Sequence, residues 1–382
     1  MIHSIYGIVE FEQQKYLVVV KSVKLAANII DKHIYQANEF DFIPLGYTAD
    51  ETSTQDGKYI DMFQNFFKRE AFYYSPEYDL TSTFEKQAKI GFKNLAANAD
   101  SRFFYNEVYV KDFLGEGLQG WIQPFMCGLV AHKYINIKNK AVGFALISRR
   151  DKNRAGMRFM SRGADLNGNV TNFAETEQIL TIKEGDDTKV YSFLQIRGSI
   201  PLIWKQTPTL KYTPKVLIEA NINKVRKAFT THFGKLKAIY RKVGIVNLID
   251  KKGSQYQLGK LFTELFNGLE DDGKLKYVWF DFHHECRKMQ WHNLSKLIDQ
   301  ISNELNDHKY TKCIAKSGSE GGQTFSVSTS QEGVIRNNCM DCLDRTNVVQ
   351  SVIARNVLLN QLHEVRKNLF FGHFSLLFLS LF

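Results

Sequence analysis

In the second part of the chain, segments whose apolar residues follow a strand pattern alternate with segments whose apolar residues follow a helix pattern. The strand-like runs are rich in β-branched and aromatic residues and cover 128–137, 141–148, 190–196 and 276–282. Helical spacing begins near residue 214 and recurs over 291–305, where Leu294, Leu297 and Ile301 share one face. This alternation predicts an α/β fold, because each helix must bury its apolar stripe against a sheet.

The first part of the chain combines a hairpin with helices. β-branched and aromatic residues fill 5–11 and 16–23, which predicts an antiparallel pair of strands. Helical spacing follows over two segments, 60–72 and 81–97.

A glycine-rich stretch separates the two parts. Leu114–Gly120 carries three glycines in seven residues, a composition typical of a linker. We therefore predict two domains, a sheet-rich domain over residues 1–118 and an α/β domain over residues 119–382.

Charge and cysteine content limit the partners and the compartment. The 382 residues carry a net charge of +10, which favours an anionic partner such as phosphate groups, nucleic acid or a membrane surface. No aromatic and basic pattern matches a nucleic-acid module, so we expect no nucleic-acid partner. Five cysteines are too few for a disulfide scaffold and indicate a reducing compartment. Part of the charge is an arginine cluster that either contacts lipid phosphates or forms ion pairs: Arg149, Arg150, Arg154, Arg158 and Arg162.

One apolar stretch, Leu369–Phe382, raises the question of membrane insertion. It covers 14 residues, whereas a spanning helix needs about 20 apolar residues. We expect a packed or frayed terminal segment, with a membrane-inserting tail as the alternative. No secretory signal is visible, because the start of the chain lacks a basic region followed by an apolar core.

A short segment near residue 340 carries the residue types of a phosphate site. Cys339 and Arg345 enclose five residues, and Thr346 follows directly. An apolar pair at 334–335 predicts a short strand, and helical spacing begins at Val348. The predicted order is therefore strand, tight loop and helix.

This order suits phosphate chemistry through a cysteine nucleophile. Backbone N–H groups of the loop and of the helix N-terminus bind phosphate oxygens, and the planar fork of Arg345 is predicted to bind two of them. The same positive field stabilises the nucleophilic thiolate at Cys339. Thr346 is predicted to hydrogen-bond the sulfur and to help it leave when water hydrolyses the phosphocysteine.

A leaving alkoxide needs a proton, and nearby carboxylates are the candidate donors. Asp341 is the first choice, with Asp344 and Asp281 as alternatives. The other residues predicted to line the substrate at the loop are Asn338, Met340, Cys342 and Leu343. Arg197 and His284 complete the predicted substrate-binding residues. The alternative is a solvated or ion-paired side chain for Arg197 and a packed core side chain for His284.

Two rival chemistries use the same segment. Cys339 and Cys342 form a Cys-x-x-Cys pair, which could be a redox dithiol or half of a zinc site. A second pair of zinc ligands would have to come from Cys313 and the cluster His283–Cys286, whose spacings fit no standard module. The His-Glu pair inside that cluster also lacks the second histidine of a zinc protease, because Lys288 stands in its place. We therefore expect no metal and no cofactor.

Ordered blocks of the chain resemble the Sac family of phosphoinositide phosphatases. Arg336–Asn347 is similar to the family signature Arg-x-Asn-Cys-Met-Asp-Cys-Leu-Asp-Arg-Thr-Asn. Further similar blocks follow one another in the family order at Tyr74–Thr81, Trp121–Pro124, Arg149–Gln178, Arg197–Trp204 and Asp281–Cys286. The likeness is greatest to the membrane-anchored branch that removes monophosphates from phosphatidylinositol.

The resemblance implies an N-terminal, sheet-rich Sac subdomain packed on an α/β catalytic domain with a Cys-x5-Arg loop between strand and helix. It implies metal-free hydrolysis of phosphatidylinositol 4-phosphate, and of the 3-phosphate, at an anionic membrane surface. Cys339 matches the family nucleophile, Arg345 the phosphate binder and Asp341 an aspartate important for activity. It also implies action at the cytosolic face of endoplasmic reticulum or Golgi membranes, with a peripheral or cytoplasmic protein as the alternative.

The chain departs from the family pattern at both ends. Family members begin some tens of residues earlier and continue well past the signature. We therefore expect an incomplete N-terminal subdomain and a truncated catalytic domain. The alternative function, from a different class, is an inactive lipid-binding or scaffold protein. The intact Cys339, Asp341 and Arg345 favour the enzyme.

Overall fold

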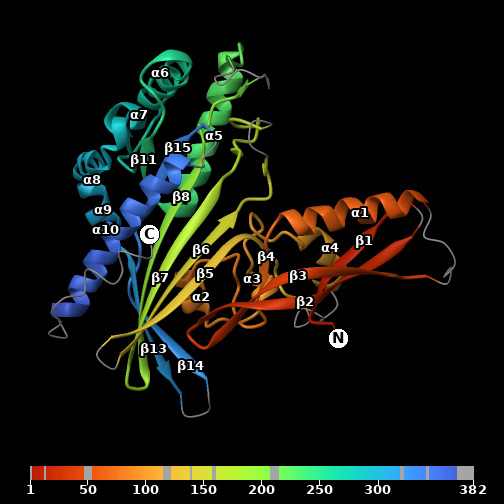
Figure 1. Cartoon of the computed structure of the whole chain (residues 1–382). Coiled ribbons are helices and arrows are strands. Elements are labelled where there is room, and N and C mark those ends of the chain that lie inside the picture. Colours follow the sequence, from red (N-terminus) through yellow and green to blue (C-terminus); the bar gives the residue numbers. More distant parts are fainter. Residues whose placement is uncertain are drawn as a thin grey trace. The chain divides into compact units, whose positions relative to one another are not determined.

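The computed structural model describes residues 2–12, 14–46, 54–114, 122–137, 140–156, 161–206, 215–318, 322–340 and 344–367. Two compact units make up the chain (Figure 1). Unit 1 consists of Met1–Lys152, Thr176–Ser192 and Lys312–Ser328. Unit 2 consists of Asn153–Glu175, Phe193–Thr311 and Thr329–Phe382. The predicted domain boundary between residues 118 and 119 lies outside the described residues and stays a prediction.

Antiparallel strands form the first part of unit 1. In spatial and chain order they are β1 (Ser4–Glu10), β2 (Lys15–Ile29), β3 (Lys32–Pro44), β4 (Phe72–Tyr74), β5 (Met126–Ile137) and β6 (Lys140–Arg150). The predicted N-terminal hairpin is confirmed, because β1 pairs with β2 and Ile5 lies opposite Val19. Between β2 and β3, Ile30 and Asp31 have φ angles of 51° and 60°, which suit a tight two-residue hairpin turn.

Strands from later in the chain complete unit 1. It includes residues 176–184 of β7 (Ala174–Glu184), 187–192 of β8 (Asp187–Ser199) and 312–317 of β13 (Thr311–Ser317), which pairs with β14 (Gln323–Thr329). The helices described in this unit are α1 (Thr54–Arg69), α2 (Phe84–Ile90), α3 (Leu95–Asn98) and α4 (Glu107–Leu114). The helix predicted over 60–72 corresponds to α1.

The prediction of one continuous helix over 81–97 is wrong, because the structure has two helices there, α2 and α3. Gly91 ends α2 with a φ of 76°, and its N–H donates to Gln87 O at 2.9 Å. Phe92 follows with a φ of 55° and packs against Phe325, with ring centroids 4.7 Å apart. The left-handed glycine turns the chain out of the helix, so that Phe92 reaches the core.

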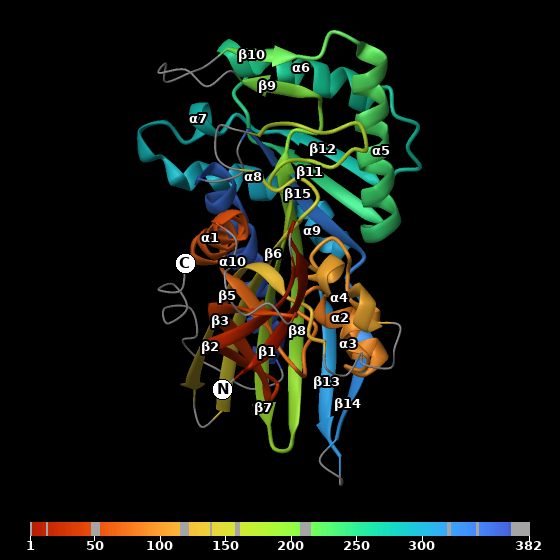
Figure 2. The same cartoon turned by 90° about the vertical axis from the view of Figure 1, so that its right-hand side faces the viewer.

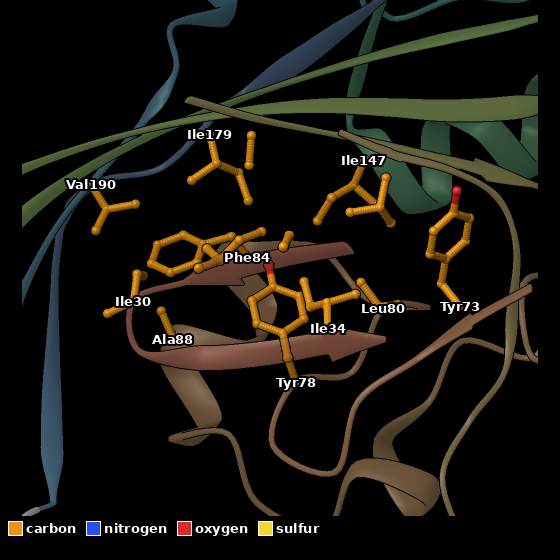
Figure 3. Close-up of a cluster of buried hydrophobic side chains, with 14 of the residues drawn as sticks. Ile30, Ile34, Tyr73, Tyr78, Leu80, Phe84, Ala88, Ile147, Ile179 and Val190 are labelled. Atoms are coloured by element: carbon orange, nitrogen blue, oxygen red, sulfur yellow. The ribbon is translucent and has the colours of Figure 1, made fainter. Parts of the chain in front are cut away.

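Two apolar clusters hold unit 1 together. In one, Ile34 and Phe84 pack with Val190, a side chain from much later in the chain (Figure 3). In the other, α1 packs on the sheet of β1–β4, and Phe67 stacks on Phe40 with ring centroids 3.8 Å apart. Fully burying one such side chain stabilises a fold by about 1.5–3 kcal/mol, so these clusters tie the helices to the strands.

Four parallel strands form the centre of unit 2, in the order β8, β15, β11 and β12. Their bounds, after β8, are β15 (Gly333–Cys339), β11 (Lys242–Asn247) and β12 (Leu275–Trp279). Every residue of β15 is buried, as expected for a central strand covered on both faces. A separate pair joins β9 (Trp204–Gln206) to β10 (Val216–Ile218).

Helices cover both faces of this parallel sheet (Figure 2). They are α5 (Ile222–Tyr240), α6 (Gly253–Asn267), α7 (Phe282–Glu285), α8 (Leu294–Gln300), α9 (Ser302–His308) and α10 (Asp344–Lys367), with 3₁₀ turns η2 (Arg287–Met289) and η3 (Trp291–Asn293). On one face, α10 packs against β15 through Ile353 and Ile335. On the other, Phe233 of α5 and Phe262 of α6 cluster with Tyr277 of β12. The predicted α/β arrangement is thus confirmed as a mixed α/β fold.

Two helix predictions in unit 2 need correction. The helix expected from near residue 214 begins at Ile222, because the Asn221 side chain accepts hydrogen bonds from two N–H groups of the first turn. The helix expected over 291–305 is divided into η3, α8 and α9. The division falls at Ile301, whose φ of −108° is not helical.

Candidate active site

The four parallel strands of unit 2 end at one edge of the sheet. β15 ends at Cys339, β11 at Asn247, β12 at Trp279 and β8 at Ser199. Because the strands run in the same direction, the loops that follow them gather at this carboxyl edge. Open parallel sheets bind their ligands there. Cys339 therefore stands at the end of the central strand, in the place where a ligand is expected.

The backbone at Cys339 is fixed from the side of β8. Cys339 is 0% exposed and lies opposite Ser199 in the register of the two strands. Ile200 N–H donates to Cys339 O at 3.2 Å, and the Ser199 hydroxyl donates to Met340 O at 3.0 Å. These bonds set the direction in which the chain leaves the strand. Three predicted site residues, Asp341, Cys342 and Leu343, lie outside the described residues.

The described chain resumes at Asp344, the first residue of α10, so Arg345 and Thr346 occupy the first turn of that helix. Thr346 is 0% exposed, and its hydroxyl has no hydrogen-bond partner among the described residues. Leaving a buried hydroxyl unpaired costs about 1–3 kcal/mol, so Thr346 is a hydroxyl in need of a partner. The sequence pattern predicted a strand at 334–335 and a helix from Val348. In the structure β15 continues to Cys339, and α10 already begins at Asp344.

Arg345 is bound to the loop that follows β11. Its Nη1 donates to Leu248 O at 3.1 Å and to Gln255 Oε1 at 3.2 Å. The same nitrogen lies 3.6 Å from Asp250 Oδ1, and the arginine side chain is 13% exposed. Leu248 directly follows β11, the neighbour of β15, so these contacts hold Arg345 at the carboxyl edge of the sheet.

Asp250 joins Arg345 to a histidine of the next loop. Its Oδ1 accepts a hydrogen bond from His283 Nδ1 at 2.8 Å, and its Oδ2 accepts one from Gln255 Nε2 at 3.0 Å. Asp250 was not among the residues predicted from the sequence. The sequence feature that could have identified Asp250 is its place as an acidic residue shortly after the apolar strand β11.

Asp281, one of the three candidate proton donors, has a structural role. Its Oδ1 accepts from His284 N–H at 3.1 Å and its Oδ2 from Lys251 N–H at 2.9 Å. Both carboxylate oxygens are therefore occupied in starting α7 and in joining it to the β11–α6 loop. The side chain of His284 is 65% exposed and lies 3.5 Å from Glu285 Oε1. The structure thus brings His283 to the Arg345 group and does not bring His284 there.

Arg197 and Asn338 lie on opposite faces of the sheet. Arg197 donates to Asn347 Oδ1 of α10 and lies beside Asn337 in the register of β8 and β15. Successive side chains of a strand alternate between faces, so Cys339 and Asn337 share the α10 face. Asn338 faces α5, and its buried amide has no hydrogen-bond partner among the described residues. Its backbone is part of the sheet, because Asn338 O accepts a hydrogen bond from Leu248 N–H at 3.0 Å.

A buried arginine–histidine pair supports β15 from the α5 side. Arg336 donates from Nε to His232 Nε2 at 3.1 Å and from Nη2 to Ser199 O at 3.1 Å. Because His232 Nε2 accepts, the ring proton lies on Nδ1, which donates to Gly168 O at 2.8 Å. Burial, followed by the charge of Arg336, holds the pKa of His232 well below its ordinary value. The neutral ring can therefore act as the acceptor for Arg336.

The rival zinc ligands lie in apolar surroundings. Cys286 belongs to the core cluster of unit 2 and Cys313 to that of unit 1. Burial raises the pKa of Cys313 to about 11 and raises that of Cys286 as well, whereas zinc binds thiolates. Within the described ranges, no three His, Cys, Asp or Glu side chains form a group that could hold a metal ion.

The membrane predictions concern two parts of the chain. Among the described helices, none combines the length and the apolar character that crossing a bilayer requires. The apolar stretch Leu369–Phe382 lies outside the described residues.

Comparison with known proteins identifies relatives over nearly the whole chain. The chain is 36% identical over 371 residues to the phosphatidylinositol-3-phosphatase SAC1-B of Danio rerio, which covers 95% of this chain and 61% of that protein. It is 34% identical over 369 residues to the phosphatidylinositol-3-phosphatase SAC1 of Saccharomyces cerevisiae, covering 94% and 57%. An uncharacterized protein of Schizosaccharomyces pombe is 35% identical over 368 residues, covering 94% and 60%. The chain thus spans about three fifths of the length of these relatives.

A family model extends over most of the chain. The model described as the SacI homology domain matches residues 3–287, which includes the blocks from Tyr74–Thr81 to Asp281–Cys286 that resemble the Sac family. The resemblance drawn from the sequence is therefore confirmed. The chain belongs to the SacI homology domain family.

Proposed function

We propose that this protein is a phosphoinositide phosphatase that hydrolyses phosphatidylinositol monophosphates, the 4-phosphate foremost and also the 3-phosphate. The observation that carries the proposal is the position of Cys339 at the end of the central parallel strand, followed by Arg345 in the first turn of the next helix. The proposed architecture is a sheet-rich Sac subdomain and an α/β catalytic domain with a Cys-x5-Arg loop between β15 and α10.

The proposed reaction proceeds through a phosphocysteine. The Cys339 thiolate attacks phosphorus, a sulfur–phosphorus bond forms, and the bond from phosphorus to the inositol oxygen breaks. Water then attacks phosphorus, and the sulfur leaves as the thiolate. Loop N–H groups, the N-terminus of α10 and the Arg345 fork stabilise the charge on the phosphate oxygens. Thr346 Oγ1, unpartnered among the described residues, hydrogen-bonds the departing sulfur.

A carboxylic acid supplies the proton that the inositol oxygen takes up as it leaves. Asp341 remains the first choice, with Asp344 as the alternative. Asp281 is the weakest of the three candidates, because each of its carboxylate oxygens already accepts a backbone N–H. The same acid, once deprotonated, accepts a proton from the attacking water.

The names of the relatives support the substrate class. The matched proteins of Danio rerio and Saccharomyces cerevisiae are named phosphatidylinositol-3-phosphatases. The preference for the 4-phosphate, and action at the cytosolic face of endoplasmic reticulum or Golgi membranes, follow from the family resemblance. The partners we propose are membrane phosphoinositides and an anionic membrane surface.

The test is phosphate release from each monophosphorylated phosphatidylinositol in liposomes. Cys339→Ser should remove nearly all turnover while lipid binding survives, because serine without an adjacent base is a poor nucleophile. A serine variant that keeps more than about a tenth of the wild-type rate would contradict the thiolate mechanism. Cys342→Ser is the matched control and should be much milder. Equal losses in the two variants would instead support the dithiol or metal chemistry.

A second candidate is an inactive lipid-binding or scaffold protein with the same fold. One observation favours it: Arg345 Nη1 is engaged by Leu248 O and Gln255 Oε1, and Asp250 stands 3.6 Å away. An arginine held by protein acceptors is less available to a phosphate. Lipid binding with no phosphate release from any monophosphorylated phosphatidylinositol would support this candidate.

A further inference from the structure

The segment 287–293, between α7 and α8, exposes two large apolar side chains next to two basic ones. Met289 is 76% exposed and Trp291 is 45% exposed. Arg287 and Lys288 directly precede them and are exposed as well. Apolar side chains that gather on a surface and are rimmed by polar residues mark sites that bind a protein, a ligand or a membrane.

The conformation of this segment is specified by contacts at its end. Asn293 Nδ2 donates to Glu285 O at 2.7 Å, and the Trp291 ring packs on Phe282 with ring centroids 6.1 Å apart. One side of Trp291 is therefore anchored while the rest faces water. Lys288 and Met289 have φ angles of 54° and 60°, a backbone that L-residues adopt only at a cost. The fold accepts this strain in the stretch that displays Met289.

Further basic side chains lie on the neighbouring β11–α6 loop. Lys251 and Lys252 are the last two residues of that loop, which is joined to α7 by the hydrogen bond from Lys251 N–H to Asp281 at 2.9 Å. Among the described residues, no carboxylate pairs with Arg287, Lys288 or Lys252, whereas Lys296 pairs with Glu285 at 3.2 Å. This surface therefore offers cationic groups that are available to an anionic partner.

We propose that residues 287–293 dock the protein onto an anionic lipid bilayer. Met289 and Trp291 enter the headgroup region, where tryptophan is favoured, and Arg287, Lys288 and Lys252 bind lipid phosphates. The docking segment follows β12 at the carboxyl edge of the sheet, the edge at which β15 ends in Cys339. The proposal of docking is supported by the exposure and contacts described above. The proposal that docking brings a lipid headgroup to Cys339 rests on the proposed function.

The test measures the depth of Trp291 directly. Vesicles of phosphatidylcholine and phosphatidylserine with brominated acyl chains should quench the tryptophan fluorescence of the full chain, and Trp291→Phe should remove most of that quenching. The measurement is made in the Cys339→Ser background, so that no turnover alters the lipids. Because quenching reports on residue 291, attachment through another part of the chain cannot produce the expected result.

A matched pair of variants tests the contribution to affinity. Met289→Gln combined with Trp291→Ser should weaken vesicle binding about tenfold or more, because both apolar side chains lose their place in the interface. Met62→Gln changes a methionine of α1 that is 66% exposed and should leave binding unchanged. Arg287→Ala combined with Lys288→Ala should flatten the decline of binding with rising salt.

Three results would overturn the proposal. The first is an unquenched Trp291 on vesicles that do bind the protein, which would assign the surface to a protein partner. The second is equal weakening by Met62→Gln and by the double variant. The third is a Met289→Gln, Trp291→Ser variant that unfolds at a lower temperature but, while folded, binds vesicles as well as the wild type. The two side chains would then support only the fold. Failure of the proposed function would give a different result. The wild-type chain would still bind vesicles but would not hydrolyse a soluble short-chain phosphoinositide.

Discussion

Arg336 Nε donates a hydrogen bond to His232 Nε2 at 3.1 Å and so joins the central strand β15 to α5. Replacing His232 with Phe would remove the acceptor of a guanidinium that is 0% exposed. Losing such a partner costs about 2–3 kcal/mol for a charged group, and we expect urea unfolding to show a decrease of that size. His232→Gln keeps an acceptor and should lose less. Equal losses would mean that ring packing, and not the hydrogen bond, supports the strand.

The unfolding free energy should fall in mild acid because of His308. Burial lowers the pKa of His308 from 6.5 to about 4. Between these values the unfolded chain binds a proton that the folded chain does not. Stability is therefore undiminished above 6.5 and is lost as the pH falls toward the folded pKa, by about 3 kcal/mol in full.

Urea unfolding of the wild type and of His308→Gln, at about pH 7 and about pH 4.5, checks this sign and size. The variant should lose less stability on acidification. The two proteins should behave alike between about pH 7 and pH 8, where neither the folded nor the unfolded His308 changes charge. A parallel decline in acid would contradict the assignment to His308.

A buried ion pair in unit 1 should show strong coupling. Arg149 Nη2 lies 2.5 Å from Glu177 Oε2, and both side chains are 0% exposed. Arg149→Met would strand a buried carboxylate and should cost about 3–5 kcal/mol. Adding Glu177→Gln should restore part of that loss. A double-mutant cycle by urea unfolding measures the coupling, and additive single losses would contradict it.

Gly163 should tolerate alanine much less well than Gly185, although both have a φ of +64°. A Cβ at Gly163 would lie 2.4 Å from Leu202 O, whereas a Cβ at Gly185 meets nothing within 4 Å. The backbone strain is common to both, so the difference isolates the clash. We expect Gly163→Ala to be less stable than Gly185→Ala by about 1–3 kcal/mol in thermal or urea unfolding. Similar values would show that the loop around Gly163 can move aside.

A shift of the backbone at Gly163 should also disturb the candidate active site. Gly163 N–H donates to Ser199 Oγ at 3.1 Å, and that hydroxyl holds Met340 O. If the proposed function is correct, Gly163→Ala should lower turnover at temperatures where the protein remains folded, while Gly185→Ala should not.

Local sequence patterns predicted the strands and helices that depend on nearby residues. The hairpin of β1 and β2, the strands β5 and β6, and the order of β15 and α10 around Cys339 all follow from short-range periodicity. The interruption of the helix at Gly91 did not, because it depends on contact between Phe92 and Phe325, more than two hundred residues later. The use of β13 and β14 in unit 1 is equally invisible to a local pattern.

Side-chain partners across the site were the least predictable. The pattern pointed to Cys339 and Arg345, but Asp250 meets His283 only because β11 and β12 are parallel neighbours. The cluster of arginines had two interpretations. Burial decided one member, since Arg149 is fully buried against Glu177, and a burial pattern of that kind depends on tertiary packing.

The position of β15 in the sheet has a consequence for how the protein is made. Ile335 pairs with Gln195, which is 140 residues earlier in the chain (335 minus 195), and the strand on its other side, β11, is also translated long before it. While the ribosome extends the chain toward residue 339, the nascent polypeptide carries β8 and β11 without the strand that joins them. Unpaired strand edges invite aggregation. Production of this protein should therefore depend on chaperones that shield β8 and β11 until β15 emerges.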